Sequence, residues 1–280
     1  MMMSEDKKKY KIYWFIGAIL SFFTYFSGLI LIYNAVRKKL ISRSRAVILT
    51  YHRIRDDAED SEISVKIKNF ENQIQHLKKN FDIIPLQELI RCIENRFPIT
   101  NDSAVITFDD GYKDNYQNAY PVLKKNNLPG TIFLISSLIG KNSDMLSLDE
   151  INEMNKHNIS FGSHTVTHRI LSEIDTDLAK SEIKKSKESL QNLLKQKIEF
   201  FAYPVGKKRH FNEAAKAAIK RCGYKAALTT INGSADASRD LFEIKRVGIR
   251  NCPLFVFKVR VSGLFESGPV FFIRKLFNLI

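Results

Sequence analysis

The chain has 280 residues and carries 44 basic against 30 acidic residues, a net charge of +14. A hydrophobic content of 44% with 26% charged residues excludes a wholly disordered chain, and twelve glycines with seven prolines exclude a collagen-like one. Half of the excess charge, +7, falls within the first 45 residues, where it flanks an apolar segment. A nucleic-acid-binding protein more often carries such an excess on its folded domain, so we expect no nucleic acid as a partner and a membrane surface instead.

The first predicted element is a transmembrane helix over residues 12–36, between a basic tail (1–11) and a basic juxtamembrane linker (37–45). Its 25 residues include no charged side chain, and as a helix they would extend about 37 Å, more than the roughly 30 Å of a hydrocarbon core. A cleaved signal peptide would have a shorter apolar region ending in a small-residue cleavage site. Residues 30–33, Ile-Leu-Ile-Tyr, offer no such site. We therefore predict an uncleaved single-pass anchor. The basic flanks are nearly balanced and favour a cytoplasmic C-terminal side only slightly.

From residue 46 onward, short β-rich segments alternate with helical patterns. Strands are predicted at 46–51, 81–84, 104–108, 131–135, 159–162, 198–203, 225–228 and 244–249. Helices are predicted at 70–79, 86–95, 116–126, 147–156, 175–195 and 212–221. Strands separated by helices indicate a parallel sheet, and seven or eight such units in about 235 residues favour an α/β fold closed into a (β/α) barrel. Catalytic groups of such barrels lie at the C-terminal ends of the strands.

The cysteines predict neither a disulfide scaffold nor a zinc ribbon. Cys92, Cys222 and Cys252 are far apart, form no C-x-x-C pair and are odd in number. We expect them to be small buried hydrophobic residues.

Two predicted strand ends carry residues that suit a metal site. The strand at 104–108 leads into Asp109 and Asp110, and adjacent buried carboxylates require a cation or a proton between them. The strand at 159–162 leads into His164 and His168, whose i, i+4 spacing can present two imidazoles to one ion. Asp-Asp-Gly alone is commonly a solvated turn, and such a histidine pair alone is commonly a helix surface. Their joint occurrence predicts a divalent metal, with zinc preferred, held by Asp110, His164 and His168, and an activated water that Asp109 deprotonates.

Three motifs resemble those of the polysaccharide deacetylase family, also called carbohydrate esterase family 4 or the NodB homology domain. Residues 107–111 match its T-F-D-D-G motif and residues 163–168 its S-H-T-x-x-H motif. Residues 201–206, Phe-Ala-Tyr-Pro-Val-Gly, are similar to its Pro-x-Gly motif. The resemblance covers about residues 46–255. It implies a distorted (β/α) barrel and a metal-dependent hydrolase that removes N-acetyl groups from an N-acetylated glycan.

The resemblance also implies roles for individual residues. Asp109 would be the catalytic base, and Val205 would offer its backbone N–H to the oxyanion. The remaining positions fall into two groups: Asp110, His164 and His168 as metal ligands, and Tyr203, Pro204 and Gly206 in the substrate-binding turn.

The chain departs from the family pattern at two places. The arginine that often begins the third motif is replaced by Ala202, and Arg246 at another strand end could take over its part in orienting Asp109. No histidine stands in the family's late Leu-x-x-His motif. A circularly permuted branch carries an early Tyr-His strand instead, and residues 51–54, Tyr-His-Arg-Ile, are similar to it, which would make His52 the general acid. Because that branch includes deacetylases of exported biofilm glycans, we expect the catalytic domain outside the cytoplasm.

Two other functions stay open, together with the role of the C-terminal end. The protein could deacetylate a lipid- or nucleotide-linked sugar at the cytoplasmic face, or be a non-catalytic, membrane-tethered glycan-binding protein. We treat 46–280 as one deacetylase domain with an apolar-basic tail at 255–280. Residues 269–280 of that tail either pack on the barrel or lie on the membrane surface.

Overall fold

The computed structural model describes residues 4–37, 39, 44–57, 62–235 and 240–264. The chain divides into two compact units: a barrel unit, Arg45–Asn251, and a helical unit formed by Met1–Ser44 with Cys252–Ile280. The barrel unit ends at Asn251, whereas the sequence analysis treated 46–280 as one deacetylase domain.

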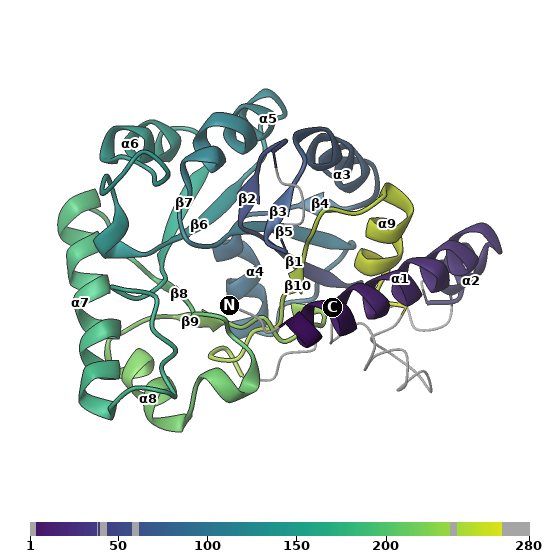
Figure 1. Ribbon diagram of the computed structural model, residues 1–280. Helices are drawn as coiled ribbons and strands as arrows, with labels where there is room; N and C mark the ends of the chain where they lie inside the picture. Colours follow the sequence, from purple (N-terminus) through teal and green to yellow (C-terminus); the bar gives the residue numbers. More distant parts are fainter. Residues whose placement is uncertain (1–3, 38, 40–43, 58–61, 236–239, 265–280) are drawn as a thin grey trace. The chain divides into compact units, whose positions relative to one another are not determined.

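The barrel unit is built on an eight-stranded sheet in the order β10-β1-β5-β6-β7-β8-β9, with β4 paired to β5 (Figure 1). Every pairing between described strands of this sheet is parallel, as the βαβ pattern predicts. The strands are β1 (Ala46–Tyr51), β4 (Asp82–Ile83), β5 (Ser103–Phe108), β6 (Gly130–Leu134), β7 (Ile159–Ser163), β8 (Phe200–Ala202), β9 (Ala226–Leu228) and β10 (Val247–Gly248).

One segment joins the two edges of this sheet. β10 pairs with β1 through Leu49 and Val247, while Ile244, just before it, forms a parallel bridge with Leu228 of β9. The backbone N–H of Thr229 donates to the Ile244 carbonyl at 2.8 Å. The parallel sheet is therefore curved into a barrel, as predicted, although the strand expected over 244–249 is regular at only two residues.

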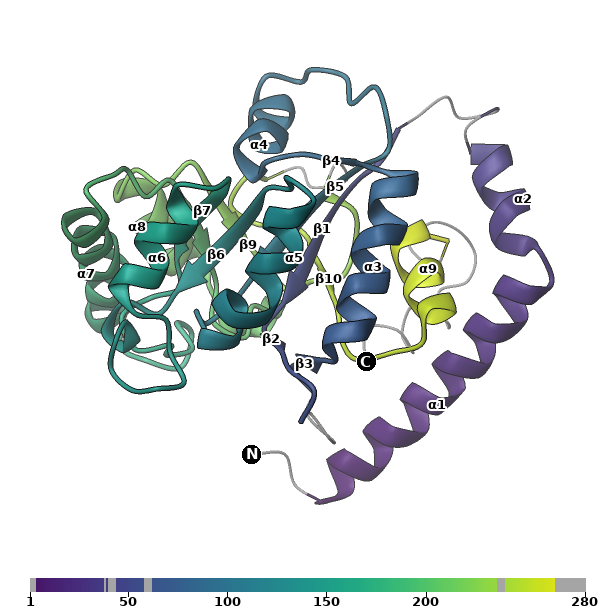
Figure 2. The same cartoon turned by 90° about the horizontal axis from the view of Figure 1, so that it is seen from above.

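The helices alternate with the strands and lie along the outside of the sheet (Figures 1 and 2). Helix α3 shows why they form: Phe70, Ile74 and Leu77 recur at helical spacing and are fully buried. Capping side chains start several of them; Ser147 and Glu150, for example, form a capping box at α6. The helices are α3 (Ile67–Asn80), α4 (Leu86–Glu94), α5 (Tyr120–Lys125), α6 (Leu148–Asn155), α7 (Thr176–Leu194) and α8 (Glu213–Arg221), with a π-helical turn at Asn115–Ala119 before α5.

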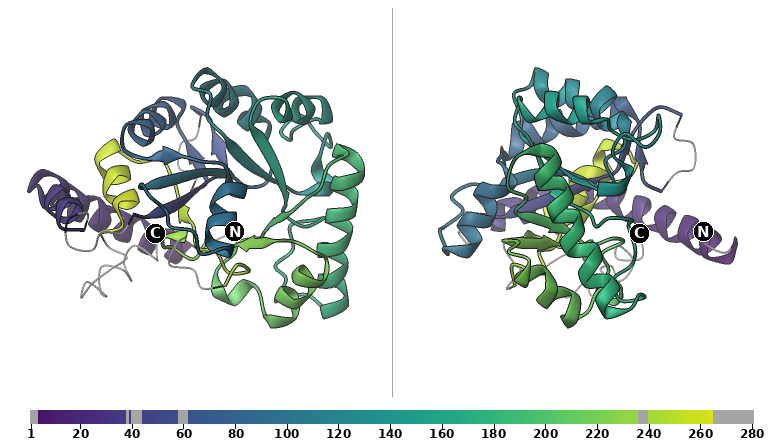
Figure 3. Two further views of the ribbon diagram at one scale, coloured as in Figure 1. Left: turned by 180° about the vertical axis from the view of Figure 1, so that it is seen from behind. Right: turned by 90° about the vertical axis from the view of Figure 1, so that its left-hand side faces the viewer.

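Helix α4 closes the end of the barrel where the strands begin, and it lies in front of the sheet in the view from behind (Figure 3). Its buried Leu86, Leu89 and Ile90 belong to one apolar cluster with Ala46, Phe200 and Ala226, which lie at the starts of three strands. The candidate site residues follow the strands at the opposite end of the barrel.

A second sheet of two strands, β2 (Arg53–Ile54) with β3 (Ser64–Val65), was not predicted. Strands of two residues are too short to show alternating polarity, which explains why the sequence pattern did not reveal them.

The helical unit contains α1 (Ser4–Phe26), α2 (Leu29–Val36) and α9 (Leu254–Ser262). The continuous helix predicted over 12–36 is interrupted at Ser27 and Gly28, and Phe15–Phe26 and Leu29–Val36 are bent by 69°. Gly28 has φ +76°, a left-handed conformation that glycine adopts at no steric cost. Among the described helices none is alone long and apolar enough to span a bilayer; the bent pair passes by length and composition. Residues 269–280 lie outside the described part of the chain.

Candidate active site

Asp109 and Asp110 follow the fully buried strand β5 and are themselves buried. Asp110 and Gly111 are both left-handed, with φ values of 74° and 78°. A Cβ atom on Gly111 would come within 2.7 Å of the Leu134 side chain. The glycine is therefore required for the turn that places two carboxylates at the end of this strand.

The two predicted histidines come together with Asp110. His164, at the end of β7, is buried, and its Nδ1 lies 2.8 Å from the Ala202 carbonyl. An Nδ1–H donated to that carbonyl leaves Nε2 as the unprotonated nitrogen. The Oδ1 atom of Asp110 lies 3.5 Å from Nε2 of His164 and 3.4 Å from Nε2 of His168.

These three residues fit a divalent metal ion. Their ligand atoms all lie within 4.8 Å of one another, and Oδ1 of Asp110 is buried with no hydrogen-bond partner. A buried carboxylate oxygen without a donor is unfavourable unless a cation meets it. Ligands bonded at about 2.0–2.2 Å to a tetrahedral ion lie roughly 3.4 Å apart, which agrees with the observed separations. Two imidazoles and one carboxylate suit zinc and other first-row ions.

The electrostatics of His164 favour its role as a ligand. Burial is the main influence and lowers the pKa of its imidazole to about 4, although the negative charge of Asp109 acts in the opposite direction. The ring is therefore neutral near pH 7, which is the form that binds a metal.

The backbone around this cluster is strained. Thr165, His168 and Val205 have φ values of 68°, 60° and 58°, which is unfavourable for any side chain and most of all for β-branched threonine and valine. Such conformations persist where surrounding contacts enforce them, and they concentrate at functional sites. One enforcing contact is local, since the His168 N–H donates to Oγ1 of Thr165 at 2.9 Å.

Glu182 of α7 is a second enforcing contact, and the sequence analysis did not identify it. Its buried carboxylate accepts the N–H groups of Val166 and Thr167 at 2.9 and 2.8 Å, and the Thr167 hydroxyl at 2.8 Å. A glutamate on the apolar face of an amphipathic helix was the available signal, because such a group needs buried donors.

Asp109 forms a buried ion pair with Arg246. The two guanidinium nitrogens lie 2.8 and 2.7 Å from its two oxygens, and Nε of Arg246 donates to the Thr229 carbonyl at 2.9 Å. Burial by itself would raise the pKa of Asp109, but the charge of Arg246 and its hydrogen bonds hold it well below the ordinary value of 3.8. The carboxylate next to the ligand cluster is therefore ionised, and its partner comes from the segment before β10 rather than from Ala202.

His52 lies beside Asp109 at the end of β1. The Asp109 N–H donates to the Tyr51 carbonyl at 2.9 Å, which keeps the ends of β1 and β5 level. His52 is half-buried, and its carbonyl accepts the Asn115 side-chain amide at 2.7 Å. Its charge is also among the influences that lower the pKa of Asp109.

The third motif forms a tight turn that exposes Val205, at 42% of its surface. A Cβ atom on Gly206 would lie 2.8 Å from the Thr230 backbone nitrogen, so only glycine fits there. The Tyr203 side chain is fully buried, and its hydroxyl donates to the Phe242 carbonyl at 3.0 Å. That hydroxyl is therefore occupied within the protein, and Pro204 beside it is also buried.

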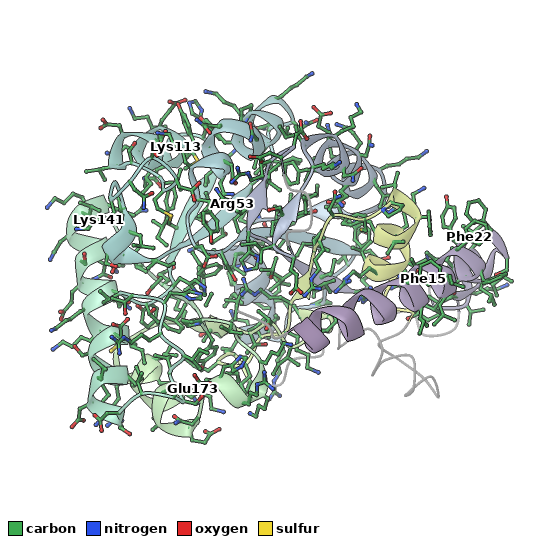
Figure 4. All side chains as sticks on the ribbon, viewed as in Figure 1. Phe15, Phe22, Arg53, Lys113, Lys141 and Glu173 are labelled. Carbon is green, nitrogen blue, oxygen red and sulfur yellow. The ribbon has the colours of Figure 1, made fainter. Side chains whose placement is uncertain are left out.

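Arg53 and Tyr112 form a further pair beside the site that sequence reasoning missed. The guanidinium of Arg53, labelled in Figure 4, lies 4.2 Å from the centre of the Tyr112 ring and also contacts Asp114 at 2.8 Å. Burial and the Asp110 charge raise the pKa of Tyr112 to about 12. Both residues directly follow motif residues, His52 and Gly111, which was the signal in the sequence.

The chain is similar in sequence and in fold to known polysaccharide deacetylases. The family model for polysaccharide deacetylase matches residues 98–227. YxkH of Bacillus subtilis (strain 168), named as a candidate polysaccharide deacetylase, is 34% identical over 204 residues, 72% of this chain and 70% of that protein. The poly-beta-1,6-N-acetyl-D-glucosamine N-deacetylase of Staphylococcus epidermidis is 30% identical over 247 residues, 78% and 84% of the two chains. The Streptococcus pyogenes deacetylase PplD, solved in complex with acetate, superposes with a TM-score of 0.68 at 30% identity, covering 74% of this chain and 93% of that one. The chain therefore belongs to the polysaccharide deacetylase family.

Proposed function

We propose that this protein is a metal-dependent hydrolase that removes N-acetyl groups from an N-acetylated glycan of the N-acetylglucosamine type. The observation that carries the proposal is Oδ1 of Asp110, a buried atom that has no hydrogen-bond partner. It lies between two imidazole nitrogens and next to the ionised Asp109. The named activity of the Staphylococcus epidermidis relative supports the substrate class.

Asp110, His164 and His168 would hold the divalent ion, with zinc as our expectation. When bound, such an ion lowers the pKa of a coordinated water and polarises the acetyl carbonyl. Asp109 takes the proton of the attacking water; its pair with Arg246 keeps it ionised and oriented, at the cost of some basicity. The Val205 N–H donates to the developing oxyanion. The exposed Val205 would border the sugar, on a turn that the buried Tyr203, Pro204 and Gly206 support.

His52 would act as the general acid that protonates the leaving nitrogen. A base and an acid with opposite protonation needs give a bell-shaped pH profile. We expect His52→Ala to lower turnover by roughly 10²-fold or more, flatten the high-pH limb and leave metal content unchanged. The exposed His157 provides the control, since His157→Ala should preserve the profile. An unchanged profile in His52→Ala would make His52 a structural residue.

The deciding experiment is a mass-spectrometric screen of N-acetylated oligosaccharides for loss of an acetyl group. It uses the full chain with and without added divalent metal, and Asp109→Asn as the variant that keeps the metal and loses turnover. Acetate release by Asp109→Asn at the wild-type rate would refute the assigned base.

Two alternatives are separated by the same screen. The basic residues that follow the apolar segment suit a cytoplasmic enzyme acting on a lipid- or nucleotide-linked sugar, so such substrates are included. A non-catalytic glycan-binding protein would bind without releasing acetate; the paired Asp109 and Arg246 argue against it.

We also propose that residues 12–36 attach the chain to a membrane. Large apolar side chains of α1 and α2 are exposed, as Figure 4 shows for Phe15 and Phe22. The single-pass span, the extracytoplasmic placement and the relation to the circularly permuted branch stay predictions from the sequence.

A further inference from the structure

The described parts of α1 and α2 expose large apolar side chains, and those of α1 share one face. Phe22, Phe23 and Phe26 are 47%, 65% and 63% exposed, and at about 100° per residue they fall with Phe15 and Ile19 into one stripe about 100° wide. Nine large hydrophobic residues on these helices are exposed, against four in the rest of the described chain. The nine are Phe15, Ile19, Phe22, Phe23, Phe26, Leu29, Leu31, Ile32 and Val36. A continuous apolar stripe of this size is suited to the hydrocarbon of a membrane leaflet rather than to water.

The bend shortens the pair relative to a straight helix. The uncharged part of α1, residues 12–26, extends roughly 22 Å, and the eight residues of α2 extend about 12 Å. With a bend of 69°, the two arms measure roughly 29 Å end to end, so they would reach across the roughly 30 Å of hydrocarbon only with that end-to-end line along the membrane normal.

Helix α9 places a charge beside the middle of the apolar segment. The Lys258 ammonium lies 2.9 Å from the Tyr25 hydroxyl, and Tyr25 is one residue from the centre of 12–36. In a straight span this ammonium would lie near the bilayer midplane, where a lysine is costly. In a segment that stays within one leaflet, it can reach the headgroups.

The same helix supports the bend on both sides. The Phe255 ring lies 6.0 Å from Phe22 and 6.1 Å from Phe26, while the Tyr33 hydroxyl of α2 donates to the Gly263 carbonyl at 3.3 Å. Contacts to both arms indicate that the bend is part of the packed helical unit.

The basic flanks give a third, independent argument. Four lysines lie within residues 7–11, and five basic residues lie within 37–45. A crossing segment normally shows a clear excess of such residues on its cytoplasmic side. Two flanks of nearly balanced basic charge are instead suited to one anionic leaflet that both of them meet.

We propose that α1 and α2 lie within one leaflet as a shallow V that does not cross the bilayer, with both flanks and the barrel unit on the cytoplasmic side. This inference rests on the proposed membrane attachment and is independent of the deacetylase activity. It replaces both the single-pass topology and the extracytoplasmic placement that the sequence alone predicted, and it favours a substrate presented at the cytoplasmic face.

The test determines on which side of the membrane two engineered cysteines of the full chain lie. In a background with Cys92→Ser, Cys222→Ser and Cys252→Ala, Ser4→Cys reports on the N-terminal end and Lys141→Cys on the barrel, where Lys141 is exposed (Figure 4). Each variant is treated with a membrane-impermeant maleimide in right-side-out and in inverted vesicles, and labelling in detergent controls for reactivity.

We expect both cysteines to be labelled only in inverted vesicles. Labelling of the two from opposite sides would establish a crossing segment and overturn the proposal, and labelling of either from the outside would overturn the cytoplasmic placement. Release of the protein by salt and carbonate would overturn the attachment and the placement in one leaflet with it. Acetate release, measured on the same preparations, reports separately on the deacetylase.

Discussion

In the barrel unit the strand ends bury charged side chains, whereas α1 and α2 expose large apolar ones. Both regions depart from the usual pattern of buried apolar and exposed charged side chains. In the barrel, Asp109 and Arg246 are 1% and 0% exposed, so full charges are removed from water. On the helices, Phe23 and Leu31 are 65% and 72% exposed, so apolar surface faces outward. A buried charge requires a countercharge or an ion, and a large apolar surface requires an apolar surrounding. Each violation therefore indicates the chemistry of the partner that the region binds.

Removing a metal ligand should have the largest effect on the barrel side of this comparison. We expect His168→Ala to lose the ion and to lower turnover by roughly 10³-fold or more, because the ion contributes several kcal/mol of transition-state stabilisation. Metal content and acetate release of the full chain are measured together, with His157→Ala as the control. Stoichiometric metal retained by His168→Ala would show that this residue is not a ligand.

Removing the countercharge tests whether the buried carboxylate depends on it. Arg246→Met leaves Asp109 buried and unpaired, and we expect a loss of about 3–5 kcal/mol in the free energy of unfolding at neutral pH. In the native chain the pKa of Asp109 is lowered, so the ion pair stabilises the fold above pH 3.8 and is lost only as the pH falls below that value. In the variant burial raises this pKa, and the low-pH limb of the rate profile should move to higher pH.

Arg250 offers the matched control for this change. It pairs with Glu62 at 3.8 Å and is 26% exposed, so Arg250→Met should cost about 1 kcal/mol or less. Urea unfolding at several pH values compares the two variants. Equal losses of unfolding free energy in both variants would mean that the Arg246 pair stabilises the fold no more than the exposed Arg250 pair does. If adding Asp109→Asn to Arg246→Met restores the stability, the unpaired carboxylate is the cause of the loss.

A charge on the apolar surface tests the other side of the comparison. Phe23→Asp should weaken membrane partitioning by about 3 kcal/mol, the difference between these side chains in a hydrocarbon environment. Phe97 is 55% exposed in the barrel unit, so Phe97→Asp should leave partitioning unchanged. Co-sedimentation of the full chain with vesicles measures both, and equal release by the two variants would exclude α1 as the contact surface.

The smallest expected effect concerns the strained metal loop. Glu182→Ala leaves the N–H groups of Val166 and Thr167 without their acceptor, which should cost about 1–3 kcal/mol and speed the release of metal to a chelator. Glu182→Gln keeps the size and one oxygen, so its effect should be smaller. If Glu182→Ala unfolds more easily yet releases metal at the native rate, Glu182 supports the fold and does not position His168.

Local sequence patterns determined the main elements and the principal site residues. Burial periodicity predicted the strands of the large sheet and six helices close to their observed bounds, since each depends on residues that are neighbours in the chain. The polar residues after β5 and β7 were predicted to meet because parallel strands end at the same edge of a sheet. The structure brings Asp110, His164 and His168 together as that rule requires.

The tertiary structure alone decided which distant groups complete the site and where the apolar segment bends. Arg246 reaches Asp109 across 137 residues, and Glu182 reaches a loop fifteen residues before it from the buried face of a helix. Such pairings depend on the packing of whole strands and helices, which brings together residues that share no local pattern. Gly28 is similar: an uncharged run appears continuous in sequence, yet a left-handed glycine and the contacts of α9 divide it into two helices. Periodicity describes one element at a time, whereas countercharges and bends follow from the free energy of the assembled fold.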